Sequence, residues 1–167
     1  MLQKVEKAYI AGFLDGDGCI MFQLVRRKDY IFGYQVRASI VFYQKRRNRM
    51  ILEWFKDKLS DGYIRDRNDG MSEYTIVGFS PTTKVLKLLL PYLRLKRDQA
   101  VLALKVAKRM PGSGKGKKIS PKLLFELAGT VDLFSVLNYS KKRVNTQSVV
   151  YQFLKSHNLF DPVETDP

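Results

Sequence analysis

Two aspartates beside glycines, Asp15 and Asp17, are the residues of this chain best suited to metal chemistry. Residues 5–15 carry apolar side chains at helical spacing, and the Gly16-Asp17-Gly18 segment ends the predicted helix. Asp17 is therefore expected at a helix C-terminus, where the helix dipole makes a carboxylate unfavourable unless a cation neutralises it. Oxygen ligands from Asp17 and a backbone carbonyl suit Mg²⁺, which keeps several waters and favours phosphate substrates.

Other interpretations of the Asp-Gly-Asp-Gly segment fit less well. An EF-hand loop counted from Asp15 needs Gly at its sixth position and Glu at its twelfth, where the chain has Ile20 and Arg26. A dinucleotide-binding loop needs a preceding strand and another glycine spacing, and two carboxylates would repel a pyrophosphate. An ordinary helix-ending turn remains an alternative for the tetrapeptide by itself.

The charge of the chain favours a polyanionic partner. Its 167 residues include 30 Lys and Arg against 16 Asp and Glu, which gives a net charge of +14. A content of 45% hydrophobic residues suffices for a core, and we expect one domain over residues 1–155 with a polar tail over 156–167.

Several classes of protein are excluded by composition. The single cysteine and single histidine, Cys19 and His157, allow neither a disulfide framework nor a zinc site of several Cys and His ligands within one chain. The longest apolar stretches fall far short of the ~20 residues of a membrane helix, so we expect a soluble protein without a membrane partner.

The elements that would position the aspartates alternate between helix and strand periodicity. Two strands with a period of two follow the first helix, and a helix over 46–59 is expected to bury Met50, Ile51, Trp54, Phe55 and Leu59. A hairpin is expected next, with strands at Tyr63–Arg67 and Glu73–Val77 and a turn at Asp69-Gly70. Four helices are then expected: one that begins at Ser80-Pro81, one over 97–110, one from Ser120-Pro121 to about Leu137, and one over Thr146–Lys155. This order predicts an α+β fold with one antiparallel four-stranded sheet (α-β-β-α-β-β-α, then helices).

One face of the predicted sheet is apolar, while the other is rich in residue types that read DNA bases. A β-ribbon fits the major groove, and Arg, Gln and Ser hydrogen-bond base edges, although an ordinary solvated face would also be polar. The candidate DNA-contacting residues are Gln23, Arg27, Tyr30, Gln35, Arg37, Ser39, Tyr43, Arg65, Arg67, Glu73 and Thr75.

The segment from Ile10 to Gly18 closely resembles the motif that names the LAGLIDADG homing endonucleases. The resemblance continues in Tyr63–Arg67, Pro91–Lys96 and Leu137–Lys141, covers residues 5 to about 155, and is greatest to the single-motif group encoded in group I introns of algal organelles. Leu127–Asp132 looks like the start of a second motif but lacks the Gly-Asp-Gly ending, so we interpret it as a core helix.

This resemblance implies a homodimeric, Mg²⁺-dependent endonuclease that cuts both strands of a long pseudopalindromic DNA target and promotes intron mobility, with Mn²⁺ expected to substitute. The dimer would form through the motif helix, at Ala8, Tyr9, Ala11, Gly12 and Asp15, the last with a mainly structural role. The implied location is an organelle, namely the chloroplast of an alga, with the mitochondrion as the alternative.

The resemblance also implies roles for individual residues. Asp17 corresponds to the metal-binding aspartate and the Gly16 carbonyl to a supporting ligand, Gln44 to the residue that positions the attacking water, and Lys96 to the basic residue near the cleaved phosphate.

Two further positions bear on the site. Asn48 stands where close relatives have a basic residue, so that Arg47 or Arg49 could substitute. Ser140 and Lys141 correspond to a segment that contacts backbone phosphates.

A binding protein is the second hypothesis. An intron maturase would use the same sheet on RNA without cleaving DNA, and RNA enters as a partner only under this alternative. The presence of Asp17, Gln44 and Lys96 argues against a simple loss of cleavage.

Overall fold

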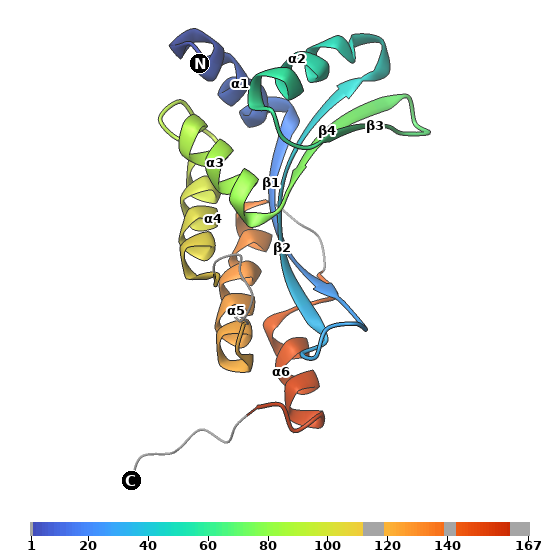
Figure 1. Ribbon diagram of the computed structural model, residues 1–167, viewed down its shortest axis with the longest axis vertical. Coiled ribbons are helices and arrows are strands. Elements are labelled where there is room, and N and C mark those ends of the chain that lie inside the picture. Colours follow the sequence, from blue (N-terminus) through green and yellow to red (C-terminus); the bar gives the residue numbers. More distant parts are fainter. Residues whose placement is uncertain (1, 112–118, 139–142, 161–167) are drawn as a thin grey trace. The chain divides into compact units, whose positions relative to one another are not determined.

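The computed structural model describes residues 2–111, 119–138 and 143–160. Its elements, shown in Figure 1, are α1 (Lys4–Asp17), β1 (Gly18–Arg26), β2 (Tyr34–Lys45), the short 3-10 helix η1 (Arg46–Asn48), α2 (Met50–Leu59), β3 (Tyr63–Asp66), β4 (Met71–Val77), α3 (Phe79–Leu89), α4 (Arg97–Arg109), α5 (Pro121–Leu137) and α6 (Gln147–Ser156). The four strands form one sheet in the order β1-β2-β4-β3, and β4 runs antiparallel to both of its neighbours. The predicted α+β fold is confirmed.

The chain divides into two compact units. The first unit comprises Met1–Phe22 with Arg37–Lys108, and the second comprises Gln23–Val36 with Arg109–Pro167. The single domain over 1–155 and the tail over 156–167 stay predictions. Within the described residues, no helix has both the length and the apolar character needed to cross a membrane.

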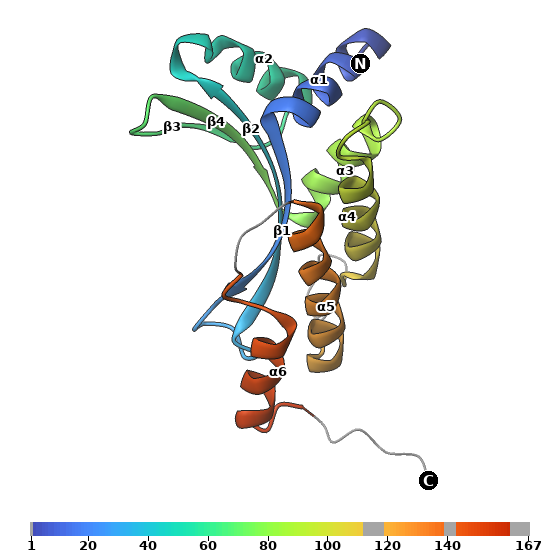
Figure 2. The same ribbon diagram turned by 180° about the vertical axis from the view of Figure 1, so that it is seen from behind.

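An aromatic cluster forms the core of the first unit, between the helices α1 and α2 and one face of the sheet (Figures 1 and 2). The ring of Phe55 from α2 lies 4.8 Å from Phe13 of α1 and 5.1 Å from Phe42 of β2, measured between centroids. Phe42 in turn stacks on Tyr74 of β4 at 5.7 Å. Among the described residues of this unit, the opposite face of β2, β4 and β3 carries no helix.

Two helix starts differ from the prediction. Helix α2 begins at Met50 and not at residue 46, because residues 46–48 form η1. Met50 was predicted to be buried but is 80% exposed, because at 100° per residue it lies on the side of the helix opposite the buried Leu52, Phe55 and Leu59. The next helix, α3, begins at Phe79 with Gly78 as its N-cap, so that Pro81 occupies the first turn, where its missing N–H leaves no helix bond unmade.

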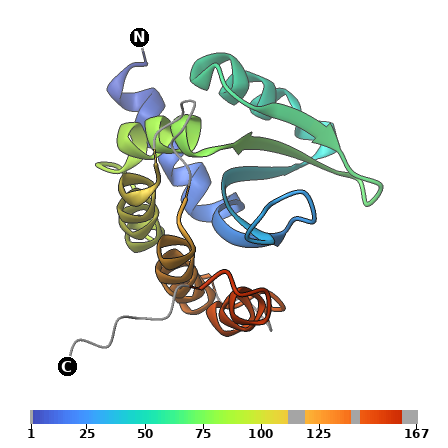
Figure 3. The same ribbon diagram turned by 60° about the horizontal axis from the view of Figure 1, so that its bottom comes forward.

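The second unit is built from α5, α6 and the β1–β2 hairpin. Ser120 caps α5 by accepting from the Leu123 N–H at 3.1 Å, which confirms the predicted start of this helix. Figure 3 shows α5 and α6 side by side. The Arg26 guanidinium lies over the rings of Tyr34, at 5.0 Å, and of Phe153 on α6, at 4.2 Å, so the hairpin is fixed to this helix.

Candidate functional site

Asp15 and Asp17 have opposite environments at the C-terminal end of α1. Asp15 is 8% exposed, and its carboxylate accepts hydrogen bonds from the backbone N–H groups of Arg94, at 2.7 Å, and Lys96, at 2.9 Å. Asp17 is the last residue of α1 and is exposed, and its carboxylate makes no hydrogen bond or ion pair within the described part of the chain. Asp15 therefore stabilises the fold, whereas the Asp17 carboxylate is available to a ligand.

The ammonium of Lys96 lies at the same helix end. Its Nζ donates a hydrogen bond to the backbone carbonyl of Asp15, one of the last carbonyls of α1. Such carbonyls carry partial negative charge, which a cation offsets. The Asp15 interactions thus bring the predicted site residue Lys96 to the helix end that carries Asp17.

Cys19 is the second residue of β1 and follows Asp17 by two positions. Burial raises the pKa of the Cys19 thiol, and the nearby Lys96 charge opposes this effect only in part. Burial also raises the pKa of Tyr43, with contributions in the same direction from Cys19 and Glu73. Because burial raises its pKa, the Cys19 thiol stays protonated at neutral pH, so that it is no nucleophile.

A row of three residues crosses the polar face of the sheet. Tyr43 of β2 and Arg65 of β3 are both direct cross-strand partners of Glu73 on β4. Arg65 donates to the Oε1 of Glu73 from Nε at 3.0 Å and from Nη2 at 2.7 Å. The Nη1 of Arg67 lies 3.8 Å from the Oε2 of Glu73, so one carboxylate faces two arginines.

The candidate DNA-contacting residues differ in the exposure of their side chains. The exposed ones are Gln23, Arg27, Tyr30, Arg37, Arg65 and Arg67, and the half-buried ones are Gln35 and Tyr43. Ser39 and Thr75 are only 4% and 6% exposed, and Glu73 is also buried. The exposed polar face is therefore smaller than strand alternation predicted.

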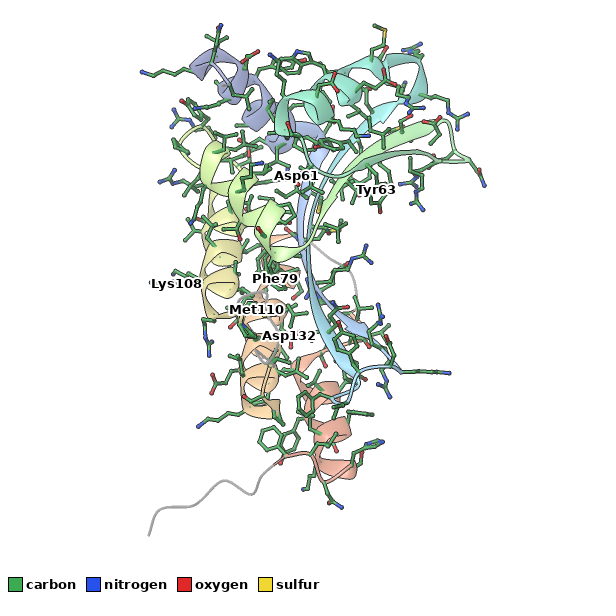
Figure 4. The ribbon with its side chains drawn as sticks, viewed as in Figure 1. Asp61, Tyr63, Phe79, Lys108, Met110 and Asp132 are labelled. Atoms are coloured by element: carbon green, nitrogen blue, oxygen red, sulfur yellow. The ribbon has the colours of Figure 1, made fainter. Side chains whose placement is uncertain are left out.

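One exposed aromatic residue was missed in the sequence. Tyr63, labelled in Figure 4, pairs with Thr75 and lies on the same face as Arg65, with its side chain exposed. The alternation along β3 was the signal that could have found it.

Arg27 is held within its own loop in the second unit. It donates to the carboxylate of Asp29 from Nε at 2.9 Å and from Nη2 at 2.7 Å, and its guanidinium lies 5.3 Å from the centroid of Tyr30. The hydrogen bonds from Arg27 lower the pKa of Asp29 to about 2. Only the atoms of Arg27 and Tyr30 that these contacts do not occupy can contact a partner.

Gln44 is not joined to the other predicted site residues. It pairs with Ser72, on the opposite face of the sheet from Tyr43, and its Oε1 accepts from the Lys45 N–H at 2.8 Å. No hydrogen bond links Gln44 to Asp17 or Lys96 among the described residues, so its role stays a prediction.

The structure distinguishes the two arginines beside Asn48. Arg49 forms ion pairs with Asp66 at 3.1 Å and Glu53 at 3.2 Å. Arg47 is exposed, and its guanidinium has no such partner within the described ranges. Of the two, Arg47 is the one whose charge is available to DNA.

The predicted dimer face is only partly exposed. Ala11 and Asp15 are buried inside the protomer, and their part in the dimer interface stays a prediction. Ala8 and Gly12 are exposed, and a Cβ at Gly12 would meet no atom within 4 Å. Tyr9 is half covered by contacts with aromatic rings of α1 and α2, namely Phe13, Trp54 and Phe55.

The predicted phosphate contacts Ser140 and Lys141 lie outside the described residues. Their neighbour Arg143 donates from Nη1 to the Val131 carbonyl at 2.7 Å, and burial lowers its pKa, so this arginine has a structural role.

Comparison with known proteins identifies the family. The sequence model of the LAGLIDADG endonuclease family matches residues 10–101. DNA endonuclease I-CvuI of Chlorella vulgaris is 41% identical over 148 residues, which cover 89% of each chain, and DNA endonuclease I-CreI of Chlamydomonas reinhardtii is 36% identical over 89% of this chain and 88% of its own. A crystal structure of I-CvuI in complex with the I-CreI target, in the presence of 2 mM Mg and with the DNA not cleaved, superposes with a TM-score of 0.86 and 40% identity over 93% of this chain and 96% of that one. With the motif helix ending in an exposed aspartate beside a polar sheet, these matches establish that the chain belongs to the LAGLIDADG endonuclease family.

Proposed function

We propose that the protein is a site-specific homing endonuclease, which cuts both strands of a long pseudopalindromic DNA target and so promotes the mobility of its intron. The observation that carries this proposal is the exposed carboxylate of Asp17 at the C-terminus of α1, which has no hydrogen bond or ion pair to any described residue. Lys96 lies at the same helix end, and Arg65 lies on the adjoining open sheet face.

The donor set at this helix end fits a divalent cation. Asp17 offers a free carboxylate, and Gly16 is exposed beside it, so its carbonyl would be the second protein ligand. The described residues contain no group of three or more His, Cys, Asp or Glu side chains close enough to hold a metal ion. Water and phosphate oxygens would therefore supply the remaining ligands. A bound Mg²⁺, for which Mn²⁺ would substitute, stabilises charge on phosphate oxygens and lowers the pKa of a coordinated water.

The protein's own side chains would bind and orient the DNA. Lys96, fixed by the Asp15 carbonyl, adds positive charge beside Asp17, where it would favour the approach of a phosphate. Arg47 adds an exposed guanidinium near the end of β2. Gln44 would hydrogen-bond the attacking water, as the family resemblance implies.

Cleavage of both strands requires a second protomer, which would contribute its own Asp17. The exposed face of α1, with Ala8 and Gly12, lets two helix backbones approach closely. We therefore propose a homodimer through α1, whose two-fold symmetry matches a pseudopalindromic target.

The function can be tested with a supercoiled plasmid that carries the uninterrupted intron-insertion sequence. We expect linear product with Mg²⁺ or Mn²⁺ and none with EDTA, and no product from the empty plasmid. An uncut plasmid together with restored splicing of the intron RNA would favour the maturase instead, and linear product in EDTA would contradict the metal requirement.

We also propose that the protein acts in an algal organelle, in the first instance the chloroplast. The resemblance to intron-encoded proteins of algal organelles supports this location. Sequencing of purified organelle DNA should find the reading frame inside a group I intron, and finding it only in nuclear DNA would oppose this proposal.

A further inference from the structure

We propose that Arg26 of β1 and Phe153 of α6 form a clamp, which holds the β1–β2 hairpin in place and thereby sets the base preference where the hairpin loop contacts the DNA target. Both would be positioning residues, because they act through the loop of residues 27–33 and need not contact the DNA. This inference rests on the proposed DNA-binding function and deepens it, since it assigns part of the specificity to a contact with α6.

Arg26 is a charged residue on the apolar face of the hairpin. Successive side chains of a strand point to opposite faces, so Arg26 shares a face with Leu24, and Gln23 lies on the other one. Leu24 and Tyr34, the first residue of β2, are each 5% exposed, whereas Gln23 is exposed. The clamp therefore lies on the face of the hairpin opposite to the candidate DNA-contacting residue Gln23.

The Arg26 guanidinium contacts two aromatic rings and one carbonyl group. It lies 4.2 Å from the ring centroid of Phe153 and 5.0 Å from that of Tyr34, and these two rings meet edge to face at 5.6 Å. A cation in such a place is attracted by the negative face of the ring. The Arg26 Nη1 also donates to the Gly33 carbonyl at 2.5 Å. The contact thus joins β1, β2, α6 and the end of the loop.

The backbone of Gly33 links the clamp to the loop. Its carbonyl accepts from the Arg27 N–H at 2.9 Å as well as from Arg26, and its N–H donates to the Tyr30 carbonyl at 2.9 Å. A Cβ at Gly33 would collide with both the Arg26 guanidinium and the Phe153 ring, so the clamp packs directly against the loop backbone. Loss of the Phe153 ring should therefore loosen the hydrogen bonds that close the loop.

The loop carries side chains that can read bases. Lys28 and Tyr30 are both exposed. Lysine pairs with the acceptors of guanine in the major groove, and a tyrosine hydroxyl both donates and accepts. A loose loop must be ordered before these side chains can hydrogen-bond a base, and this ordering opposes binding. Because the cost falls only on a duplex with the matching base, the clamp should raise base preference more than affinity for DNA in general.

Hydrogen exchange without DNA tests the clamp itself. Phe153→Leu removes the ring but keeps an apolar side chain on α6. The backbone N–H groups of Arg27 and Gly33 should then exchange about two- to thirtyfold faster than in the wild type, the range that the loss of a cation–π contact gives. Phe153→Tyr keeps the ring and should exchange at the wild-type rate.

Tyr151→Leu is the matched control, because it makes the same kind of change on the same helix. The Tyr151 ring contacts the rings of Phe125 and Phe160, with centroids 5.7 and 5.6 Å away. Tyr151→Leu should leave the exchange of Arg27 and Gly33 unchanged.

Selection from a pool of DNA duplexes with about twenty randomised base pairs then tests the link to specificity. Lys28→Ala and Tyr30→Ala mark the target positions that the loop contacts, because each variant loses preference there. Phe153→Leu should reduce the preference at these marked positions by about two- to thirtyfold and leave the other positions unchanged. Phe153→Tyr and Tyr151→Leu should keep the wild-type preference.

A double variant separates one shared contact from two independent structural roles. Arg26→Met nearly keeps the length of the side chain at an exposed position and removes the guanidinium. It should lose preference at the same marked positions as Phe153→Leu does. The double variant should lose no more than Arg26→Met alone, because both substitutions remove the same contact. Losses that add would overturn the clamp.

The outcomes distinguish this inference from the proposed function. Failure of the wild type to select any sequence would contradict the DNA-binding function, while the exchange rates still test the clamp. Unchanged exchange in Phe153→Leu, or a specific wild type in which neither Lys28→Ala nor Tyr30→Ala changes any preference, would overturn the inference alone. Faster exchange with unchanged preference would also overturn it. If circular dichroism shows that Phe153→Leu is unfolded, Arg26→Met gives the same two tests.

Discussion

Asp15 and Asp17 should differ in how much their replacement lowers the free energy of unfolding. In the wild type, the Asp15 carboxylate accepts from the backbone N–H groups of both Arg94 and Lys96. Replacing Asp15 by Asn would put an amide N–H opposite one of these donors. We expect Asp15→Asn to lower the free energy of unfolding by about 1–3 kcal/mol. Asp17→Asn, which loses no such bond, should change it by at most about 0.5 kcal/mol.

Urea denaturation of the two variants beside the wild type gives this comparison directly. Equal stabilities of Asp15→Asn and the wild type would show that the Asp15 contacts do not stabilise the helix end.

The chemical roles of the site residues are easier to predict from the sequence than the contacts that surround them. The Gly-Asp-Gly ending placed Asp17 at a helix C-terminus, and α1 indeed ends there. The burial of Asp15 was not predictable in the same way, because it depends on Arg94, which lies 79 residues further along the chain. The ion pairs that distinguish Arg47 from Arg49 likewise need Asp66, on a strand beyond α2.

At the scale of elements, α1 presents Gly12 at a point where a Cβ would have no described atom within 4 Å. Because a Cβ at Gly12 would meet nothing within 4 Å, Gly12→Leu should leave the protomer folded. The larger side chain should instead prevent the close approach of a second helix. We expect Gly12→Leu to sediment as a monomer with unchanged circular dichroism.

A control for this variant is Lys56→Leu, at an exposed position of α2, which should remain dimeric. An unaltered dimer in Gly12→Leu would show that the protomers associate elsewhere.

Two glycines with similar backbone angles at the ends of β3 and β4 should respond differently to substitution. Gly62 has φ 84° and Gly70 has φ 80°, so alanine at either is strained by about 1–2 kcal/mol. At Gly62 a Cβ would also lie 2.3 Å from the Thr75 carbonyl oxygen, whereas the space around Gly70 is open. Gly62→Ala should therefore destabilise the protein more than Gly70→Ala does, by at least about 1 kcal/mol.

Thermal or urea unfolding of both alanine variants measures this difference. Equal destabilisation would mean that β4 can shift away from residue 62 at no cost.

The elements themselves were largely predictable, and the exceptions have local causes. The alternation of apolar residues predicted β1 and β2, and Asp69-Gly70 predicted the turn between β3 and β4. The start of α2 was missed because residues 46–48 form the 3-10 helix η1, and the start of α3 because its N-cap is Gly78 and not the expected Ser80. Neither feature has a strong sequence signal.

At the scale of the whole molecule, charge should govern affinity for DNA. A dimer carries 2 × 14 = 28 excess positive charges. If it neutralises about six to ten phosphates, the logarithm of the binding constant should fall with the logarithm of salt concentration at a slope of about −5 to −9. Fluorescence anisotropy at several salt concentrations measures this slope.

A slope shallower than about −2 would contradict a binding mode in which phosphate contacts dominate. The position of the preferred bases should not change with salt, because base contacts release few counterions.

The most direct test of the account compares binding and cleavage by Asp17→Asn. The substitution removes the exposed carboxylate at the end of α1 and keeps the shape of the side chain, and it eases the negative charge at the helix end. The account predicts that Asp17→Asn binds the target duplex within a few fold of the wild type and produces no linear plasmid in Mg²⁺. Mg²⁺-dependent cleavage at the wild-type rate by Asp17→Asn would contradict it.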